Sequence, residues 1–111
     1  MKRGQVVIAA PGEPFGRKPR PYVVVQSDAY QTALVLLVGF TTAEDSEPNI
    51  VRPRFAPTST NGLLETSDAM VDAVIAVRRS KARDIVGVLS DDEMYEIEAA
   101  LVRLLGLAEG A

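Results

Sequence analysis

Arg20 is the residue of this sequence whose type and setting best suit a chemical role. It ends a basic loop rich in glycine and proline, residues 12–20, and stands just before the apolar run that begins at Tyr22. The chain contains no His and no Cys, so any reaction must rest on arginine, carboxylates, hydroxyls and backbone groups. Because arginine keeps its proton near neutral pH, it suits an oxyanion or a phosphate better than general-base work. The sequence therefore indicates phosphate chemistry around Arg20.

The charged residues are unevenly distributed along the chain. The formal net charge of −3 argues only weakly against nucleic-acid binding. Basic residues gather in residues 1–22 and again in residues 78–83, whereas acidic residues gather in 44–47 and 91–98. The two basic segments either converge on one face or belong to an ordinary mixed surface.

The composition is expected to support a single domain over residues 1–111, since 47% of the residues are apolar and can build one small core. A core of this size often gains stability when a dimer buries further surface. No apolar run approaches the roughly 18 residues that a membrane span needs, so no membrane association is expected. The basic N-terminus is too short for a signal peptide, and we therefore expect a cytoplasmic protein.

Short apolar runs between turn residues predict several strands and few helices. One run, residues 50–55, contains Pro53 and is expected to be an edge strand or a bulge. Gly87 is expected to mark a bulge or a close approach of two backbones. The other predicted strands are residues 5–10, 22–26, 32–40, 70–77 and 85–89.

The C-terminal segment predicts the one helix. Ser90 is followed three residues later by Glu93, which is a capping-box pattern, and Gly106 is a suitable C-terminal stop. Apolar residues at three- and four-residue spacing predict one buried face, made of Met94, Ile97, Leu101, Leu104 and Leu105. The fold class is therefore mainly β (α+β), a small antiparallel barrel with a C-terminal amphipathic helix packed on it.

The order of these segments resembles that of the MazF/PemK (Kid) toxins of bacterial toxin–antitoxin pairs. The resemblance rests on residues 2–7, on the Arg-Pro pair and strand of residues 20–28, on residues 38–42 ending in two threonines, and on residues 86–90 with the helix that follows. It implies an SH3-like barrel, a homodimer and a metal-independent endoribonuclease without a cofactor. Members of this family cut single-stranded RNA through its own 2′-hydroxyl and leave 2′,3′-cyclic phosphate and 5′-hydroxyl ends.

The resemblance also implies catalytic residues at matching positions. The family's catalytic arginine falls on Arg20, and its catalytic threonine falls on Thr42, with Thr41 as the alternative. An aspartate of Kid-type members falls on Asp72, although Met70 stands where those members have an arginine. The implied RNA-contacting residues are Arg17, Lys18, Phe15, Gln26 and Thr41, and Phe15 and Tyr22 are aromatic residues that could stack on a base.

Cleavage of this kind needs a base for the 2′-hydroxyl proton, a group that stabilises charge on phosphorus, and an acid for the leaving oxygen. Arg20 suits the charge, and Thr42 could add a hydroxyl. The candidates for proton transfer are Asp72, Glu13, or an arginine acting as acid with water as base. Asp72 could instead pair with Arg52 or Arg54 and hold two strands together.

The resemblance implies a second partner besides single-stranded RNA. A MazE-like antitoxin would cover the RNA site with its disordered tail, and operator DNA would be a partner only of the toxin–antitoxin complex. Two other functions compete with the ribonuclease. One is a gyrase-poisoning toxin of the CcdB type, which residues 25–28 also resemble, and the other is a catalytically silent barrel that binds only the antitoxin. The shortened loop before Arg20 leaves the cleavage sequence unassigned.

Overall fold

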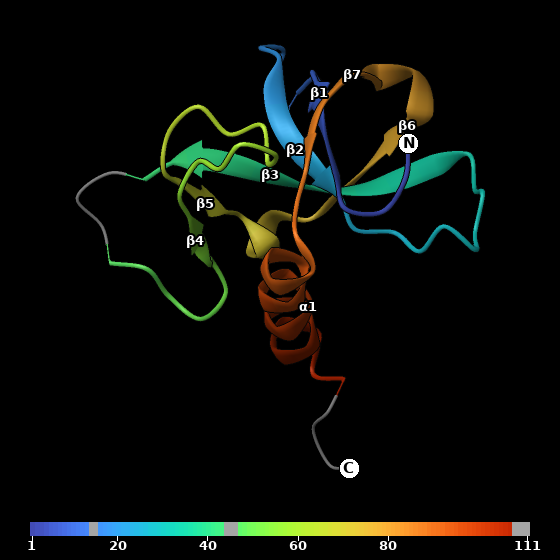
Figure 1. The fold of residues 1–111 in the computed structure, drawn as a ribbon. Coiled ribbons are helices and arrows are strands. Elements are labelled where there is room, and N and C mark those ends of the chain that lie inside the picture. Colours follow the sequence, from blue (N-terminus) through green and yellow to red (C-terminus); the bar gives the residue numbers. More distant parts are fainter. Residues whose placement is uncertain (14–15, 44–46, 108–111) are drawn as a thin grey trace.

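Antiparallel strands followed by one α-helix form the framework of the described chain (Figure 1). The computed structural model describes residues 1–13, 16–43 and 47–107. Two 3₁₀ helices, η1 and η2, flank strand β6. In chain order the elements are β1 Gln5–Ala9, β2 Arg20–Val24, β3 Leu34–Thr42, β4 Arg54–Phe55, β5 Ser67–Ala69, η1 Val71–Ala73, β6 Ile75–Arg78, η2 Arg79–Lys81, β7 Ala82–Val88 and α1 Asp91–Leu105.

Strand β3 is the centre of the sheet. One of its edges pairs with β2, in a register that places Tyr22 opposite Gly39. Its other edge pairs with β6 along residues 34–37 and with β5 along residues 40–42. Strand β1 joins β2 to β7, so the strand order is β4-β5-β3-β2-β1-β7 with β6 beside β3. Because β2 and β3 are antiparallel neighbours, the start of β2 and the end of β3 lie at the same end of the sheet.

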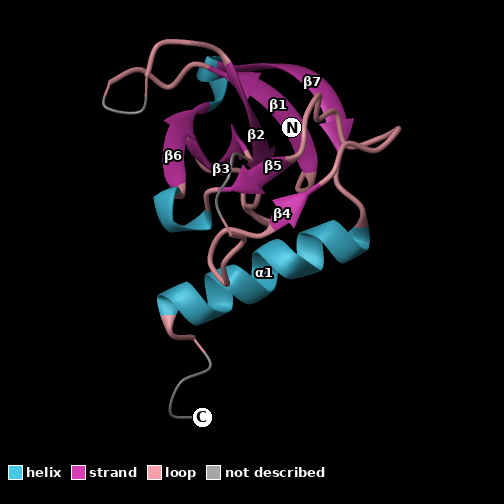
Figure 2. Ribbon diagram, turned by 90° about the vertical axis from the view of Figure 1, so that its left-hand side faces the viewer, coloured by secondary structure: helices cyan, strands magenta, loops and turns pink. Residues whose placement is uncertain are grey.

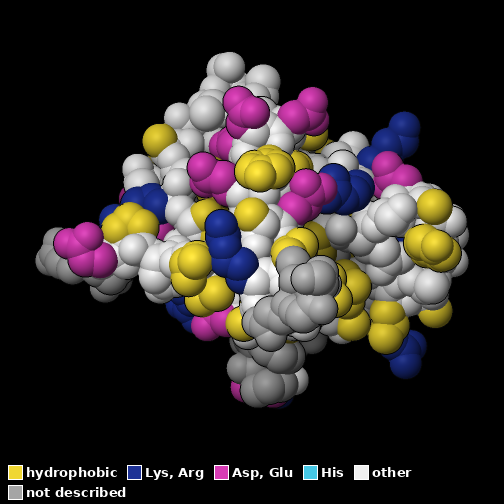
Figure 3. Space-filling model, turned by 90° about the horizontal axis from the view of Figure 1, so that it is seen from below, with side chains coloured by type: hydrophobic (Ala, Val, Ile, Leu, Met, Phe, Trp, Pro, Cys, Tyr) yellow, Lys and Arg dark blue, Asp and Glu magenta, His cyan; other side chains and the backbone are white. Residues whose placement is uncertain are grey.

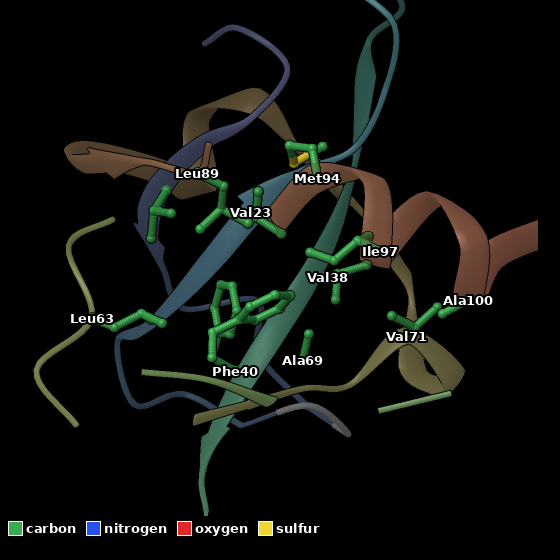
Figure 4. Packing of buried hydrophobic residues seen from close by; sticks show 12 residues of the cluster. Val23, Val38, Phe40, Leu63, Ala69, Val71, Leu89, Met94, Ile97 and Ala100 are labelled. Atoms are coloured by element: carbon green, nitrogen blue, oxygen red, sulfur yellow. The ribbon is translucent and has the colours of Figure 1, made fainter. Parts of the chain in front are cut away.

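The central strands are buried on both faces, which explains why they read as continuous apolar runs. One core lies inside the curl of the sheet and contains Val7, Val24 and Leu37. The other lies between the sheet and α1. Figure 4 shows this second core, in which side chains of α1 point toward Val38 and Val71.

Helix α1 begins and ends as predicted. The Ser90 side chain accepts a hydrogen bond from the Glu93 N–H, and the Glu93 carboxylate accepts one from the Ser90 N–H. Gly106 closes the helix in the left-handed region at φ 70°. The predicted buried face is wrong at its far end, because Leu104 and Leu105 are exposed. Figures 1 and 2 show the reason, since the last turns of α1 extend beyond the strands.

The predicted fold class is confirmed, with one difference in closure. The sheet is antiparallel and strongly curled, and a single α-helix packs against it in the described chain. No recorded strand pairing among the described residues joins β6 to β7 or β4 to β7. The curled sheet is therefore open rather than a closed barrel.

The strand predicted over residues 70–77 is wrong for its first part. The 3₁₀ turn η1 separates β5 from β6, so within the predicted range only residues 75–77 belong to a strand, β6. The turn lets the fully buried Val71 enter the core beneath α1 while Asp72 stays at the surface. A pattern of apolar residues does not reveal this turn, because strands and a buried 3₁₀ turn both place valines inward.

Two predictions about irregular strands are confirmed. Strand β4 lies at the edge of the sheet, as predicted for residues 50–55, although it covers only the last two of them. It directly follows Pro53, which has no N–H to donate. In β7, Gly87 faces Val6 and Ile85 faces Val7, so Val86 is the extra residue of a bulge. A Cβ on Gly87 would lie 2.5 Å from the Gly62 nitrogen, which is the predicted close approach of two backbones.

Candidate active site

The start of β2 and the end of β3 border a hollow of about 760 Å³. Arg20 and Pro21 line it from β2, and Thr42 lines it from β3. The segment before β5 supplies a further wall that includes Glu65. A volume of this size lies within the range that small-ligand pockets commonly occupy, roughly 300–1,000 Å³. The antiparallel pairing of β2 with β3 thus brings together two of the three residues to which the family resemblance assigned catalysis, and Asp72 is not among the residues that line the hollow.

Arg20 is exposed and presents a cation that no described carboxylate pairs with. The residue two positions along β2, Tyr22, is buried, and its ring packs so closely over Gly39 that a Cβ there would lie 2.8 Å from Cε2. Burial raises the pKa of the Tyr22 phenol, and the nearby positive charge of Arg20 opposes this shift. Tyr22 is therefore a neutral, fixed residue behind Arg20. The prediction that Tyr22 could stack on a base is wrong, because the core covers its ring.

Thr42 is exposed, and its hydroxyl lies 3.3 Å from Glu65 Oε2. Sequence reasoning missed Glu65. Its position before β5 carries no motif, and only the pairing of β3 with β5, which sets Thr42 opposite Ser67, brings its carboxylate to the hollow. Thr41, the alternative to Thr42, pairs with Asp68 across the β3–β5 ladder and does not line the hollow in the described residues.

Buried Asn61 shapes the wall that carries Glu65. Its Oδ1 accepts hydrogen bonds from the N–H groups of Thr58 and Leu63, each at 3.1 Å. Its Nδ2 donates to the Ala56 carbonyl at 2.9 Å and to Glu93 Oε2 at 3.0 Å. Since Glu93 also caps α1, this amide ties the wall of the hollow to the start of the helix.

Asp72 lies outside this hollow in an ion pair with Arg52. Its two oxygens accept hydrogen bonds from the guanidinium at 2.8 and 3.2 Å, which confirms the predicted pairing of these two residues. The hydrogen bond from Arg52 lowers the pKa of Asp72, against a smaller opposing effect of burial. A second fork of the same kind joins Arg54 to Asp68. Asp72 therefore holds η1 to the segment before β4.

The remaining predicted RNA-contacting residues lie in different places. Arg17 and Lys18 are exposed in the loop that leads to Arg20. Gln26 follows the opposite end of β2, where its side chain bonds Thr32 at 2.9 Å and the Tyr30 carbonyl at 2.8 Å, so the fold does not bring it to the hollow. Phe15 lies outside the described residues.

Each of the two basic segments has an arginine that contacts a partner within the chain. Arg3 pairs with Glu98 of α1, and Arg79 donates to the Thr32 carbonyl at 2.8 Å. Figure 3 shows the face that carries the end of α1, where acidic, basic and apolar side chains are intermixed over the described atoms. On that face the ordinary mixed surface is observed.

The described residues show neither a metal-binding cluster nor a membrane-spanning helix. They contain no group of three or more acidic, His or Cys residues arranged to hold a metal ion. None of the helices in the described ranges is long and apolar enough to cross a membrane.

The fold and the site together define a small β-protein in which a curled antiparallel sheet carries an exposed arginine and an exposed threonine in one hollow. The sequence model of the PemK-like, MazF-like toxins of type II toxin–antitoxin systems matches residues 2–105. The chain is 38% identical over 109 residues to the probable endoribonuclease MazF of Mycolicibacterium smegmatis, covering 97% of this chain and 99% of that protein. It is 30% identical over 115 residues to endoribonuclease MazF6 of Mycobacterium tuberculosis, covering 96% and 98%. The chain therefore belongs to the PemK-like, MazF-like toxin family of type II toxin–antitoxin systems.

Solved structures agree with this assignment. An endoribonuclease in complex with its cognate antitoxin, from a mycobacterial species, superposes with a TM-score of 0.77 at 26% identity, covering 96% of each chain. A MazE–MazF structure from Deinococcus radiodurans gives a TM-score of 0.72 at 21% identity, covering 96% of this chain and 95% of that one, and supports the fold alone. The predicted family is confirmed, and the match selects it over the gyrase-poisoning alternative.

Proposed function

We propose that this chain is the toxin of a type II toxin–antitoxin pair and a metal-independent, sequence-specific endoribonuclease that cuts single-stranded RNA and so inhibits translation and growth. The 2′-hydroxyl of the RNA attacks the adjacent phosphorus, and the products carry 2′,3′-cyclic phosphate and 5′-hydroxyl ends. The observation that carries the proposal is the placement of exposed Arg20 in one hollow with Thr42, in a fold whose relatives are named endoribonucleases.

Arg20 binds the phosphate at which the chain is cut. Its guanidinium offers several N–H groups in a fixed fork that matches two phosphate oxygens. A single donor aimed at developing charge commonly contributes about 3–4 kcal/mol to transition-state stabilisation. The hydroxyl of Thr42 is placed to bond either the phosphate or the carboxylate beside it. Arg17 and Lys18 extend the positive charge along the incoming strand.

The proposal includes a homodimer, an antitoxin and a cytoplasmic location. Exposed apolar residues occur on β3, at Leu34 and Leu36, and on β7, at Ile85 and Val88, and exposed apolar side chains suit contact with a second copy. The mycobacterial structure that superposes on this chain is described as a complex with a cognate antitoxin. A MazE-like antitoxin would block the hollow by placing an acidic or extended segment over Arg20, and operator DNA would be bound only by the toxin–antitoxin complex.

A cleavage assay in EDTA tests the proposal. Wild type, Arg20→Ala and Arg20→Lys are incubated with a long single-stranded RNA, and both ends of each product are mapped. We expect discrete cuts with 5′-hydroxyl and cyclic-phosphate ends, and a rate about 100- to 1,000-fold lower for Arg20→Ala. Arg20→Lys keeps the charge without the fork and should fall in between.

Arg78→Ala is the matched control, because Arg78 is an exposed arginine of β6 that does not line the hollow. It should cut at the wild-type rate. If the wild-type protein cuts no RNA, the proposed ribonuclease function fails. Growth arrest without cutting would then indicate another toxic activity, and the absence of both would indicate a catalytically silent barrel. Loss of cutting in EDTA with recovery in magnesium would contradict metal independence.

A further inference from the structure

One carboxylate, that of Glu65, lines the hollow beside Arg20 among the described residues. The Thr42 hydroxyl lies 3.3 Å from Oε2, and no described residue bonds Oε1. Glu65 is exposed, so a bound substrate can reach the open oxygen. Apart from Arg20, the hollow has no other charged lining residue in the described chain, and its remaining polar side chains are hydroxyls.

The other acidic candidates lie elsewhere. Both oxygens of Asp72 are engaged by Arg52, and Asp72 does not line the hollow. Glu13 is exposed in the loop before β2 and is also absent from the described lining. A chain without histidine has few side chains that accept a proton near neutral pH. Among the described residues that line the hollow, the carboxylate of Glu65 is therefore the side chain best suited to act as a base.

We propose that Glu65 is the general base of this ribonuclease and accepts the proton of the attacking 2′-hydroxyl on Oε1. This inference rests on the proposed function. It assigns a catalytic role to a residue to which neither the sequence pattern nor the family resemblance assigned one.

Thr42 then acts as a positioning residue for Glu65. An ionised carboxylate only accepts hydrogen bonds, so the single hydroxyl proton of Thr42 is the one shared with Oε2. While that proton points at Glu65 it cannot also bond a phosphate oxygen, and stabilisation of the phosphate falls to Arg20. The bond to Thr42 fixes one carboxylate oxygen and leaves the other turned to the substrate.

The proposed step balances without any co-reactant. The 2′-oxygen gives its proton to Glu65 and forms a bond to phosphorus, while Arg20 holds the non-bridging oxygens. The bond from phosphorus to the 5′-oxygen breaks, and that oxygen takes a proton from solvent water. Glu65 then releases its proton to solvent, so the products are the cyclic phosphate and the 5′-hydroxyl, with no water consumed.

The test compares Glu65→Gln and Glu65→Asp with wild type in single-turnover cleavage of a short RNA centred on a mapped cut site. Glutamine keeps the size of the side chain and an oxygen for Thr42 but is not a base. We expect the Glu65→Gln rate to fall about 100- to 10,000-fold and the Glu65→Asp rate to fall less. Affinity for the same RNA with a 2′-deoxy sugar at the cut site should stay within a few-fold of wild type.

Two further readouts separate a base from a structural residue. The wild-type rate should rise with pH on the acidic side, and Glu65→Gln should lose that rise. A 5′-sulfur leaving group does not need protonation, so an RNA with this substitution relieves the loss of a general acid but not the loss of a general base. With this RNA, Glu65→Gln should therefore remain as slow relative to wild type as with ordinary RNA. Glu96→Gln makes the same chemical change on the exposed surface of α1, away from the hollow, and should cut like wild type.

Several outcomes would overturn the assignment. Glu65→Gln cutting at the wild-type rate would exclude Glu65 as the base, and a faster rate with tighter RNA binding would show that Glu65 merely repels phosphate. A thermal melt of each variant, together with its RNA affinity, separates misfolding from lost chemistry. If wild type itself cuts no RNA, the proposed function fails. If wild type cuts and Glu65→Gln cuts equally well, only the assignment of Glu65 fails.

Discussion

Replacing Asn61 by alanine removes the side chain that links the wall of the hollow to helix α1. The amide is fully buried and makes four hydrogen bonds of 2.9 to 3.1 Å. The alanine variant leaves two backbone N–H groups and one carbonyl without these partners, and Glu93 loses one donor. Such unsatisfied groups lower the stability of the folded state, because folding removes them from water and the variant gives them no hydrogen-bond partner in return.

We expect a loss of about 3 kcal/mol in the free energy of unfolding, since a net hydrogen bond contributes about 1 kcal/mol and some orphaned groups will find water. For a domain of this length, 1 kcal/mol corresponds to about 4 °C in Tm, so Tm should fall by about 12 °C. Urea unfolding followed by circular dichroism gives the free energy, and a thermal melt gives Tm.

Asn49→Ala is the matched control. Asn49 is exposed, and its side chain accepts one hydrogen bond, from the Val51 N–H at 3.0 Å. Its replacement should cost less than about 1 kcal/mol. An Asn61→Ala variant that loses no more stability than Asn49→Ala would refute the argument that this amide holds the wall in place.

The remaining predictions concern stability and RNA affinity. Gly87→Ala should lose about 3 kcal/mol in urea unfolding, because its Cβ would lie 2.5 Å from backbone atoms that cannot yield; a near-neutral result would contradict the close approach. Ser90→Ala should lose about 1 kcal/mol with the capping box, measured in the same way. Asp72→Asn should cut RNA like wild type and be less stable by under about 1 kcal/mol at pH 7, because the ion pair with Arg52 is partly exposed. The ion pair with Arg52 lowers the pKa of Asp72 in the folded state. The stabilisation from this pair is therefore present above the unfolded pKa of about 4 and is lost as pH falls through the lowered pKa of the folded state. A stability difference between wild type and Asp72→Asn that persists at lower pH would exclude the ion pair as its source. RNA affinity, measured with uncleavable RNA, should fall about 20-fold between 50 and 200 mM salt if the three cations of residues 17–20 contact phosphates, and salt-independent binding would argue against those contacts.

The local elements of this fold could be predicted because neighbouring residues define them. The start of α1 follows from Ser90 and Glu93, three residues apart, and its stop follows from Gly106. Central strands buried on both faces leave continuous apolar runs, so β1, β2 and β3 were found to within a few residues. The order of these segments, with the Arg-Pro pair at the second strand, was enough to predict the family.

Contacts between distant parts of the chain could not be predicted in this way. The 3₁₀ turn η1 replaced part of a predicted strand because Val71 fits beneath a helix that begins 20 residues later. The far end of α1 was predicted to be buried, although no strand extends far enough to cover Leu104 and Leu105.

By itself, the sequence determined the antiparallel class of the fold, the capped helix and the position of Arg20 next to the second strand. Only the tertiary structure decided which acidic residue shares the hollow with Arg20. Thr42 and Glu65 are 23 residues apart in the sequence, and the pairing of β3 with β5 brings the Glu65 carboxylate to the hollow. Arg52 and Asp72 are 20 residues apart, and the turn after β5 places Asp72 in an ion pair with Arg52 instead. The physical reason is that side-chain spacing and caps act over one turn or one strand, whereas strand register depends on how the whole core packs.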